Sequence, residues 1–226
     1  MKVTTDACLF GAWVAAEINR FSKPPDRLLD IGTGTGLLSL MVAQKNGGRI
    51  DALEIDLAAS EQASENVGAS PWKEKISIVH HDVLQWQPPA LYDCLFSNPP
   101  FYEKELRSTK EAKNIAHHDE GLKLADLLHF IKQHLTKDGS FFLLLPAKRD
   151  AEAERLFAKA GLSIAQKVYL QQTLKHPPFR LMIRGCHKKT ITVTEQTICI
   201  RNDAGDYTTS FVRLLQDYYL YLSMAS

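Results

Sequence analysis

A glycine-rich turn, LLDIGTGTG at residues 28–36, contains the first residues whose types and spacing suit a defined chemistry. Its three glycines follow an apolar run and precede a helical pattern, so the backbone can turn sharply and a ligand can lie against it. A dinucleotide fingerprint would need a further glycine at position 37, where Leu37 stands. The turn therefore predicts a cofactor site and disfavours NAD or FAD.

Three carboxylates lie at the ends of three successive predicted strands. Asp30 precedes the glycine turn, where it would repel a pyrophosphate and accept hydrogen bonds from the ammonium group of S-adenosylmethionine. Glu54 ends the second strand and can chelate ribose hydroxyls, whereas Asp56 suits the N-cap of the next helix. Asp82 follows the third strand and can accept from the cofactor's adenine amino group. The predicted cofactor residues at these strand ends are Asp30, Gly32, Thr33, Gly34, Glu54 and Asp82.

The segment Asn98-Pro99-Pro100-Phe101 follows the fourth predicted strand. Its prolines hold the backbone extended, so that the Asn98 side-chain oxygen and the Pro99 carbonyl can accept both hydrogens of a planar amino group. Phe101 offers a face on which a base can stack. These acceptors would favour a more tetrahedral nitrogen aimed at a methyl donor. The segment therefore predicts a catalytic site for methylation of an amino nitrogen, made of Asn98, Pro99, Pro100 and Phe101.

Alternating apolar runs and amphipathic segments must position these residues, and they are typical of βαβ units. Strands are predicted at 27–31, 49–54, 76–79, 91–96, 140–145, 162–170 and 180–187. Helices are predicted at 36–44, 57–68, 121–135 and 150–160, with further helices at 6–21 and about 208–222. The expected fold class is α/β, with a seven-stranded, mostly parallel sheet, an antiparallel last strand and helices on both faces.

Length and composition bound the organisation of the chain. Its 226 residues, 45% of them hydrophobic, predict a single domain over 1–226 with a helical segment at 1–26. The net charge of +1 provides no overall field that would attract a polyanion. The spacing of the four cysteines disfavours disulfides and zinc, and no metal site is expected. No membrane span, export signal or obligate protein partner is indicated, so we expect a cytoplasmic location.

The two motifs together resemble those of the class I, Rossmann-like methyltransferases that act on amino groups. The N-terminal KVTTDACLFGAW and the C-terminal YTTSFVRLLQDYYL are similar to the ends of the bacterial tRNA1(Val) adenine-37 N6-methyltransferase family. This resemblance, over nearly the whole chain, implies S-adenosylmethionine as cofactor and the adenine 3′ of a valine anticodon as target. It also implies that Thr5 and Asp6 line the methionine portion of the cofactor.

A tRNA substrate requires cationic contacts to phosphates. Basic side chains follow the Asn-Pro-Pro-Phe segment, and others lie near the last predicted hairpin. The predicted RNA-binding residues are Lys104, Arg107, Lys110, Lys113, His118 and Arg180. The chain departs from the family at Thr4, where glycine is common, and at His117, where arginine is common. The second departure places a histidine where the arginine of the family would contact a phosphate.

Other functions use the same motifs. Glutamine methyltransferases of protein release factors grip a planar amide with a similar segment, but they carry tyrosine in place of Phe101 and a separate N-terminal domain. A ribosomal RNA adenine methyltransferase fits the motifs as well. A non-catalytic RNA-binding or cofactor-sensing module is a further alternative, because fold alone does not establish activity.

Overall fold

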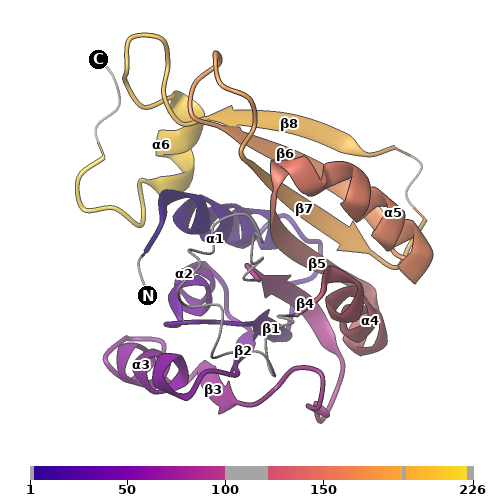
Figure 1. Cartoon of the computed structure of the whole chain (residues 1–226). Helices are drawn as coiled ribbons and strands as arrows, with labels where there is room; N and C mark the ends of the chain where they lie inside the picture. Colours follow the sequence, from indigo (N-terminus) through magenta and orange to yellow (C-terminus); the bar gives the residue numbers. More distant parts are fainter. Residues whose placement is uncertain (1–2, 100–121, 190–191, 223–226) are drawn as a thin grey trace, which may run out of the picture.

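A computed structural model describes residues 3–99, 122–189 and 192–222 of the chain, and an eight-stranded sheet forms its centre (Figure 1). The strand order is β3-β2-β1-β4-β5-β7-β6-β8. The strands are β1 (Arg27–Ile31), β2 (Arg49–Glu54), β3 (Ile76–His80), β4 (Tyr92–Ser97), β5 (Leu135–Pro146), β6 (Ser163–Gln171), β7 (Arg180–Cys186) and β8 (Thr194–Cys199). The helices are α1 (Thr5–Ile18), α2 (Leu37–Lys45), α3 (Leu57–Gly68), α4 (Leu124–His134), α5 (Asp150–Ala160) and α6 (Thr209–Leu215).

The sheet is mostly parallel, as the sequence predicts. Strand β7 runs antiparallel to its neighbours β5 and β6, and the other pairings are parallel. The predicted antiparallel strand at 180–187 is therefore confirmed, but the sheet has one more strand than predicted. β8 pairs with β6 and forms the edge of the sheet.

Strand β8 is difficult to detect in the sequence because it is a polar edge strand. Its first four residues are exposed, and only Ile198 is buried within it. A strand with so little buried surface lacks the apolar alternation by which strands are predicted. A polar edge also disfavours pairing with a strand of another molecule.

Helices cover both faces of the sheet, as predicted, and each face has its own apolar core (Figure 1). One core joins α1, α2 and α6 to the sheet, and includes the fully buried Phe10 and Phe142. The other joins α4 and α5 to the opposite face, and includes Phe141 and Phe157, whose rings lie 5.4 Å apart. The buried strands between these layers are therefore apolar on both sides.

The C-terminal helix is shorter than the predicted 208–222, because α6 ends at Leu215. The chain beyond it packs against α2. Tyr218 donates its hydroxyl to the carbonyl of Met41, 3.2 Å away, and Asp217 lies 2.7 Å from the ammonium of Lys45. These contacts with α2 replace a further helical turn. None of the described helices combines the length and the apolar character needed to span a lipid bilayer.

Candidate active site

The ends of β1 and β4 bring the glycine turn and Asn98 side by side. In the parallel register Ile31 pairs with Ser97, so the residues that follow, Gly32 and Asn98, leave neighbouring strands at the same edge. The buried Ser97 hydroxyl donates to the Ile31 carbonyl at 2.6 Å, across 66 residues of sequence. This role of Ser97 was not predicted, because a serine before a turn carries no signal of its partner.

The glycine turn has the backbone that its sequence predicts. Gly32, Gly34 and Gly36 have φ angles of 71°, 59° and 84°, which side chains other than glycine rarely adopt. A Cβ on Gly32 would meet no atom within 4 Å, so the turn borders open space. The amides of Gly32 and Thr33 both donate to the Leu53 carbonyl, at 2.8 and 2.9 Å. The turn is therefore fixed to β2 and leaves room for a ligand beside Gly32.

Asp30 is wholly buried at the end of β1. One carboxylate oxygen, Oδ2, accepts hydrogen bonds from Thr33 at 2.7 Å and from Ser39 at 2.8 Å. The other oxygen, Oδ1, is buried and has no partner among the described residues. Burial raises the pKa of Asp30 to about 6, against the opposing effect of the Thr33 and Ser39 hydrogen bonds. An unmatched buried carboxylate oxygen suits a cationic ligand group, such as the ammonium of S-adenosylmethionine.

Glu54 lies at the end of β2 and connects its own turn with the glycine turn. Its Oε2 accepts from the Gly34 amide at 2.8 Å, and its Oε1 accepts from the amides of Ile55 and Asp56, each at 3.0 Å. Asp56 itself caps α3 by accepting from the Ala59 amide at 2.8 Å, which confirms its predicted role as N-cap. Of the two carboxylates at the end of β2, Asp56 therefore caps α3 and Glu54 contacts the glycine turn.

Asp82 follows β3 at the same edge, where the His81 amide donates to the Glu54 carbonyl at 2.9 Å. Its carboxylate accepts from the Leu84 amide at 2.9 Å and from the Gln85 side chain at 3.2 Å. Both partners belong to its own turn. The expected hydrogen bond from a cofactor adenine stays a prediction.

Asn98 and Pro99 are the described part of the Asn-Pro-Pro-Phe segment. Pro99 is buried, Asn98 is half-buried, and the Asn98 side chain has no hydrogen-bond partner in the described part of the chain. Its amide is therefore not committed to holding the turn. The remaining predicted residues in this region lie outside the described residues: Pro100, Phe101, Lys104, Arg107, Lys110, Lys113 and His118.

Two predicted groups with different expected roles form one ion pair. Asp6, expected near the cofactor, lies in the first turn of α1, directly after the exposed Thr5. Its carboxylate accepts from Nε of Arg180, the expected RNA contact, at 2.7 Å across 174 residues. Burial acts to raise the pKa of Asp6, but hydrogen bonds from Thr4 and Arg180 outweigh it and lower the pKa below its usual value.

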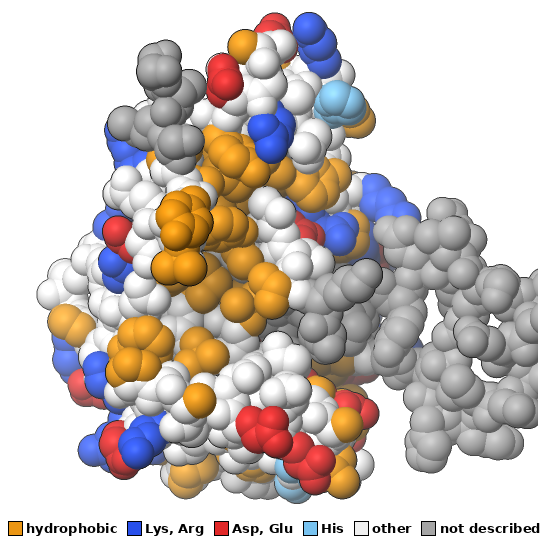
Figure 2. Space-filling model, turned by 90° about the vertical axis from the view of Figure 1, so that its left-hand side faces the viewer, with side chains coloured by type: hydrophobic (Ala, Val, Ile, Leu, Met, Phe, Trp, Pro, Cys, Tyr) orange, Lys and Arg blue, Asp and Glu red, His pale blue; other side chains and the backbone are white. Residues whose placement is uncertain are grey.

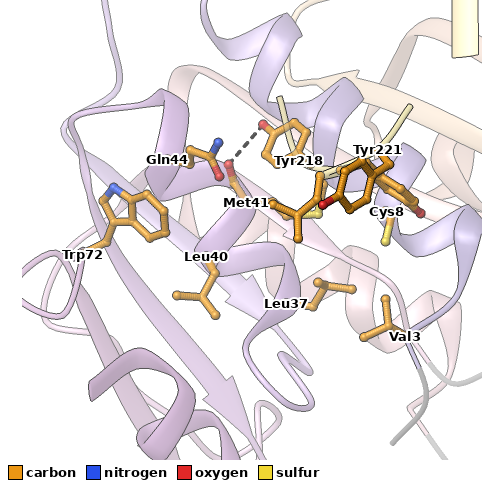
Figure 3. A pocket seen from close by; sticks show the side chains of 11 residues that line it. Val3, Cys8, Leu37, Leu40, Met41, Gln44, Trp72, Tyr218 and Tyr221 are labelled. Atoms are coloured by element: carbon orange, nitrogen blue, oxygen red, sulfur yellow. Dashed lines mark hydrogen bonds between the residues drawn. The ribbon is translucent and has the colours of Figure 1, made fainter. Parts of the chain in front are cut away.

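Two hollows lie in the surface near these elements. An apolar hollow of about 570 Å³ is lined by α2 and the C-terminal tail, and Figure 3 shows Leu37, Leu40 and Met41 opposite Tyr218 and Tyr221. A polar cleft of about 420 Å³ is lined by Asp6 and Arg180, among others. Neither is lined by Asp30, Glu54 or Asn98. Across the described residues, no group of three or more His, Cys, Asp or Glu side chains could hold a metal ion.

Comparison with known proteins identifies the class. A family profile for the methyltransferase small domain matches residues 16–170. The crystal structure of a predicted O-methyltransferase from Agrobacterium tumefaciens has a TM-score of 0.69, at 13% identity, over 97% of this chain and all of that one. This second likeness shows the fold. The profile, the sheet and the glycine turn together define a methyltransferase of Rossmann-like, class I architecture.

Comparison with curated relatives narrows the class further. The chain is 38% identical to the tRNA1(Val) (adenine(37)-N6)-methyltransferase of Dyadobacter fermentans, over 97% of this chain and 91% of the relative. It is 35% identical to the protein of the same name from Proteus mirabilis, over 98% of this chain and 88% of the relative. The chain belongs to the tRNA1(Val) (adenine(37)-N6)-methyltransferase family.

Proposed function

We propose that this protein transfers a methyl group from S-adenosylmethionine to the exocyclic N6 amine of adenine 37 in tRNA1(Val). Family membership supports the reaction and the substrate. The observation that carries the proposal for the site is the Ile31–Ser97 register, which brings Asn98 to the same edge as the glycine turn. The side chain of Asn98 has no hydrogen-bond partner among the described residues.

The cofactor would be held by groups at the ends of β1, β2 and β3. The unpartnered oxygen of Asp30 accepts from the cofactor ammonium. Oε1 of Glu54 already accepts two hydrogen bonds and Oε2 accepts one, so Oε2 has a lone pair left for a ribose hydroxyl. Asp82 accepts from the adenine amino group. The backbone of Gly32, Thr33 and Gly34 lies against the ligand, and Thr5 and Asp6 close the methionine side. The bound cofactor supplies an electrophilic methyl group on a sulfonium.

The target base would be held by the Asn-Pro-Pro-Phe segment. The Asn98 side-chain oxygen and the Pro99 carbonyl accept the two hydrogens of the adenine amino group, and Phe101 stacks on the base. Pro100 keeps the two acceptors in one extended backbone. The rate enhancement comes from holding the nitrogen in line with the methyl group, so no strong general base is needed.

The substrate tRNA would be bound without a separate RNA-binding domain. Basic side chains beyond the target site supply phosphate contacts, and an unpaired anticodon-loop base costs less to extrude than one in a duplex. We assign this role to Lys104, Arg107, Lys110, Lys113, His118 and Arg180. We further propose that the chain is one domain, acts without an obligate protein partner or a metal, and works in the cytoplasm, where tRNA is modified.

The test is a methyl-transfer assay with labelled S-adenosylmethionine and unmodified valine tRNA, followed by digestion and mass spectrometry of the labelled nucleoside. We expect N6-methyladenosine at position 37, and its loss in Asn98→Ala with cofactor affinity unchanged. Label found only in ribosomal RNA or in protein would overturn the substrate and keep the chemistry. Cofactor binding without transfer to any fraction would favour a binding module.

A further inference from the structure

The polar cleft of about 420 Å³ lies between the start of α1, the turn before β7 and the segment after β8. Its lining includes Asp6, Phe179, Arg180, Arg201 and Tyr207. Strands β6 and β8 run parallel to the central strands, so the cleft opens at the same sheet edge as the glycine turn. Figure 2 views the molecule from this side.

The two arginines of the cleft differ in how their charge is balanced. Arg180 is paired with Asp6 at 2.7 Å. Arg201 has no carboxylate within ion-pair distance among the described residues. Its guanidinium donates to the Gly205 carbonyl and lies over the Tyr207 ring, 4.2 Å from the ring centre. The cleft therefore keeps one uncompensated positive charge and favours an anionic ligand.

The segment that carries Arg201 is fixed by backbone hydrogen bonds. The Arg201 amide donates to the Gln172 carbonyl at 3.0 Å, and Arg201 forms a β-bridge with Tyr207. The turn between them contains Gly205 at a φ of 90°, and the Asn202 amide donates to the Asp206 carbonyl at 2.9 Å. The guanidinium is thus held in place before any ligand arrives, which lowers the entropy cost of binding.

An exposed aromatic side chain accompanies the cations. Phe179 is 38% exposed and follows two prolines, while its own amide donates to the Leu170 carbonyl at 2.9 Å. Tyr207 is half-buried and stacked on Phe211 at 4.6 Å, so it supports Arg201 and is less available to a ligand. Cations beside an exposed aromatic ring are typical of grooves that bind single-stranded nucleic acid, because phosphates and bases alternate along the strand.

We propose that this cleft binds the single-stranded RNA next to the target adenine, with Arg201 on a phosphate and Phe179 stacked on a base. The assignment rests on the proposed function, since it takes the substrate to be RNA. The cleft would be a second RNA subsite, near the end of β8, in addition to the RNA contacts predicted in the segment that follows Asn98. The Asp6–Arg180 pair is part of the cleft lining, and Asp6 belongs to the first turn of α1, so the RNA would lie beside the predicted cofactor residues Thr5 and Asp6.

Arg201→Gln tests the phosphate contact, and Arg213→Gln is the matched control because Arg213 is an exposed arginine on the nearby α6. We expect Arg201→Gln to raise the KM for valine tRNA about tenfold and to lower the slope of log Kd against log salt concentration by about one. The kcat and the affinity for S-adenosylmethionine should stay the same, which a general loss of structure would not allow. Equal KM and equal salt slopes in the two variants would overturn the proposal.

Phe179→Ala tests the stacking contact, and its exposed side chain makes misfolding a small risk. We expect a several-fold higher KM for tRNA with an unchanged salt slope; an unchanged KM would overturn the role of Phe179. Binding of the same tRNA is measured separately by fluorescence anisotropy without the cofactor. Arg201-dependent binding without methyl transfer would keep the subsite and overturn the proposed function. Equal methylation by both arginine variants would keep the function and overturn the subsite.

Discussion

Two buried charges, Asp30 and Lys167, have opposite surroundings. Asp30 is wholly buried, accepts two hydroxyl hydrogen bonds on one oxygen and forms no ion pair with any of the described residues. Lys167 is 3% exposed, and its ammonium lies 2.6 Å from Asp150, 2.5 Å from Glu154 and 4.0 Å from Glu195. A buried charge surrounded by opposite charges is costly to remove, because its partners are left unpaired, whereas a buried charge without them is a candidate position for a ligand.

The two surroundings shift the pKa values in ways that fit this difference. Burial raises the pKa of Asp30 to about 6, and the negative charge of Glu54 nearby adds to this effect. Burial alone would lower the pKa of Lys167, but its hydrogen bonds with Asp150 and Glu154 and the negative charge of Asp150 raise it above its usual value. The carboxylate therefore changes its charge in mildly acidic solution, and the ammonium keeps its charge.

The largest expected effect comes from removing the charge of Asp30. In Asp30→Asn we expect the affinity for S-adenosylmethionine to fall about 100-fold, or about 3 kcal/mol, because a charge-assisted hydrogen bond to the ammonium is lost. Isothermal titration calorimetry measures it. Asp56→Asn is the control, since Asn also caps a helix well. Equal affinities in these two variants would contradict a cofactor role for Asp30.

Removing the ammonium of Lys167 should lower the free energy of unfolding and leave the binding of S-adenosylmethionine intact. Lys167→Met leaves carboxylates of α5 and β8 facing one another, and we expect the free energy of unfolding to fall by about 2 kcal/mol. This is below the loss typical of a wholly buried pair, because the partners are partly exposed. Urea denaturation measures the free energy of unfolding of this variant and of the control Lys159→Met, which changes an exposed lysine of α5. If both variants unfolded at the same urea concentration, the cluster would contribute nothing.

Acid should weaken cofactor binding through Asp30. The ammonium of the cofactor binds the carboxylate form of Asp30, so protonation of Asp30 weakens binding. Because the pKa of Asp30 is raised in the folded protein, the carboxylate form is lost as the pH falls through about 6. We expect roughly tenfold weaker binding of S-adenosylmethionine at pH 5 than at pH 7. The comparison is with Asp30→Asn over the same range, where binding should change little. A flat profile for the unaltered protein would show that Asp30 does not contact the ligand charge.

The smallest expected effect concerns the hydrogen bond between β4 and β1. Ser97→Ala removes the donor to the buried Ile31 carbonyl, and we expect a loss of about 1 kcal/mol in the free energy of unfolding. The exposed Ser77→Ala on β3 is the control. We also expect a decrease in kcat, because Asn98 follows directly. Full stability and full kcat would mean that backbone pairing alone fixes the end of β4.

Much of the fold follows from local patterns. The seven predicted strands and most of the helices are present, because apolar periodicity and glycine or proline positions act over a few residues. The polar strand β8 and the early end of α6 were not predicted. In both places, contacts with distant residues decide the structure: β8 pairs with β6, and the tail after α6 contacts Met41 and Lys45 of α2.

The sequence by itself determined which groups are available at the candidate site. Positive φ angles require glycine at Gly32 and Gly34, prolines fix the backbone after Asn98, and acidic residues lie at the ends of the predicted strands. Only the tertiary structure decided how these groups meet. The Ile31–Ser97 register, the Asp6–Arg180 pair and the unmatched oxygen of Asp30 depend on strand order and packing. The physical reason is range: backbone preferences are set by adjacent residues, whereas the partners of a side chain are set by elements far away in the sequence.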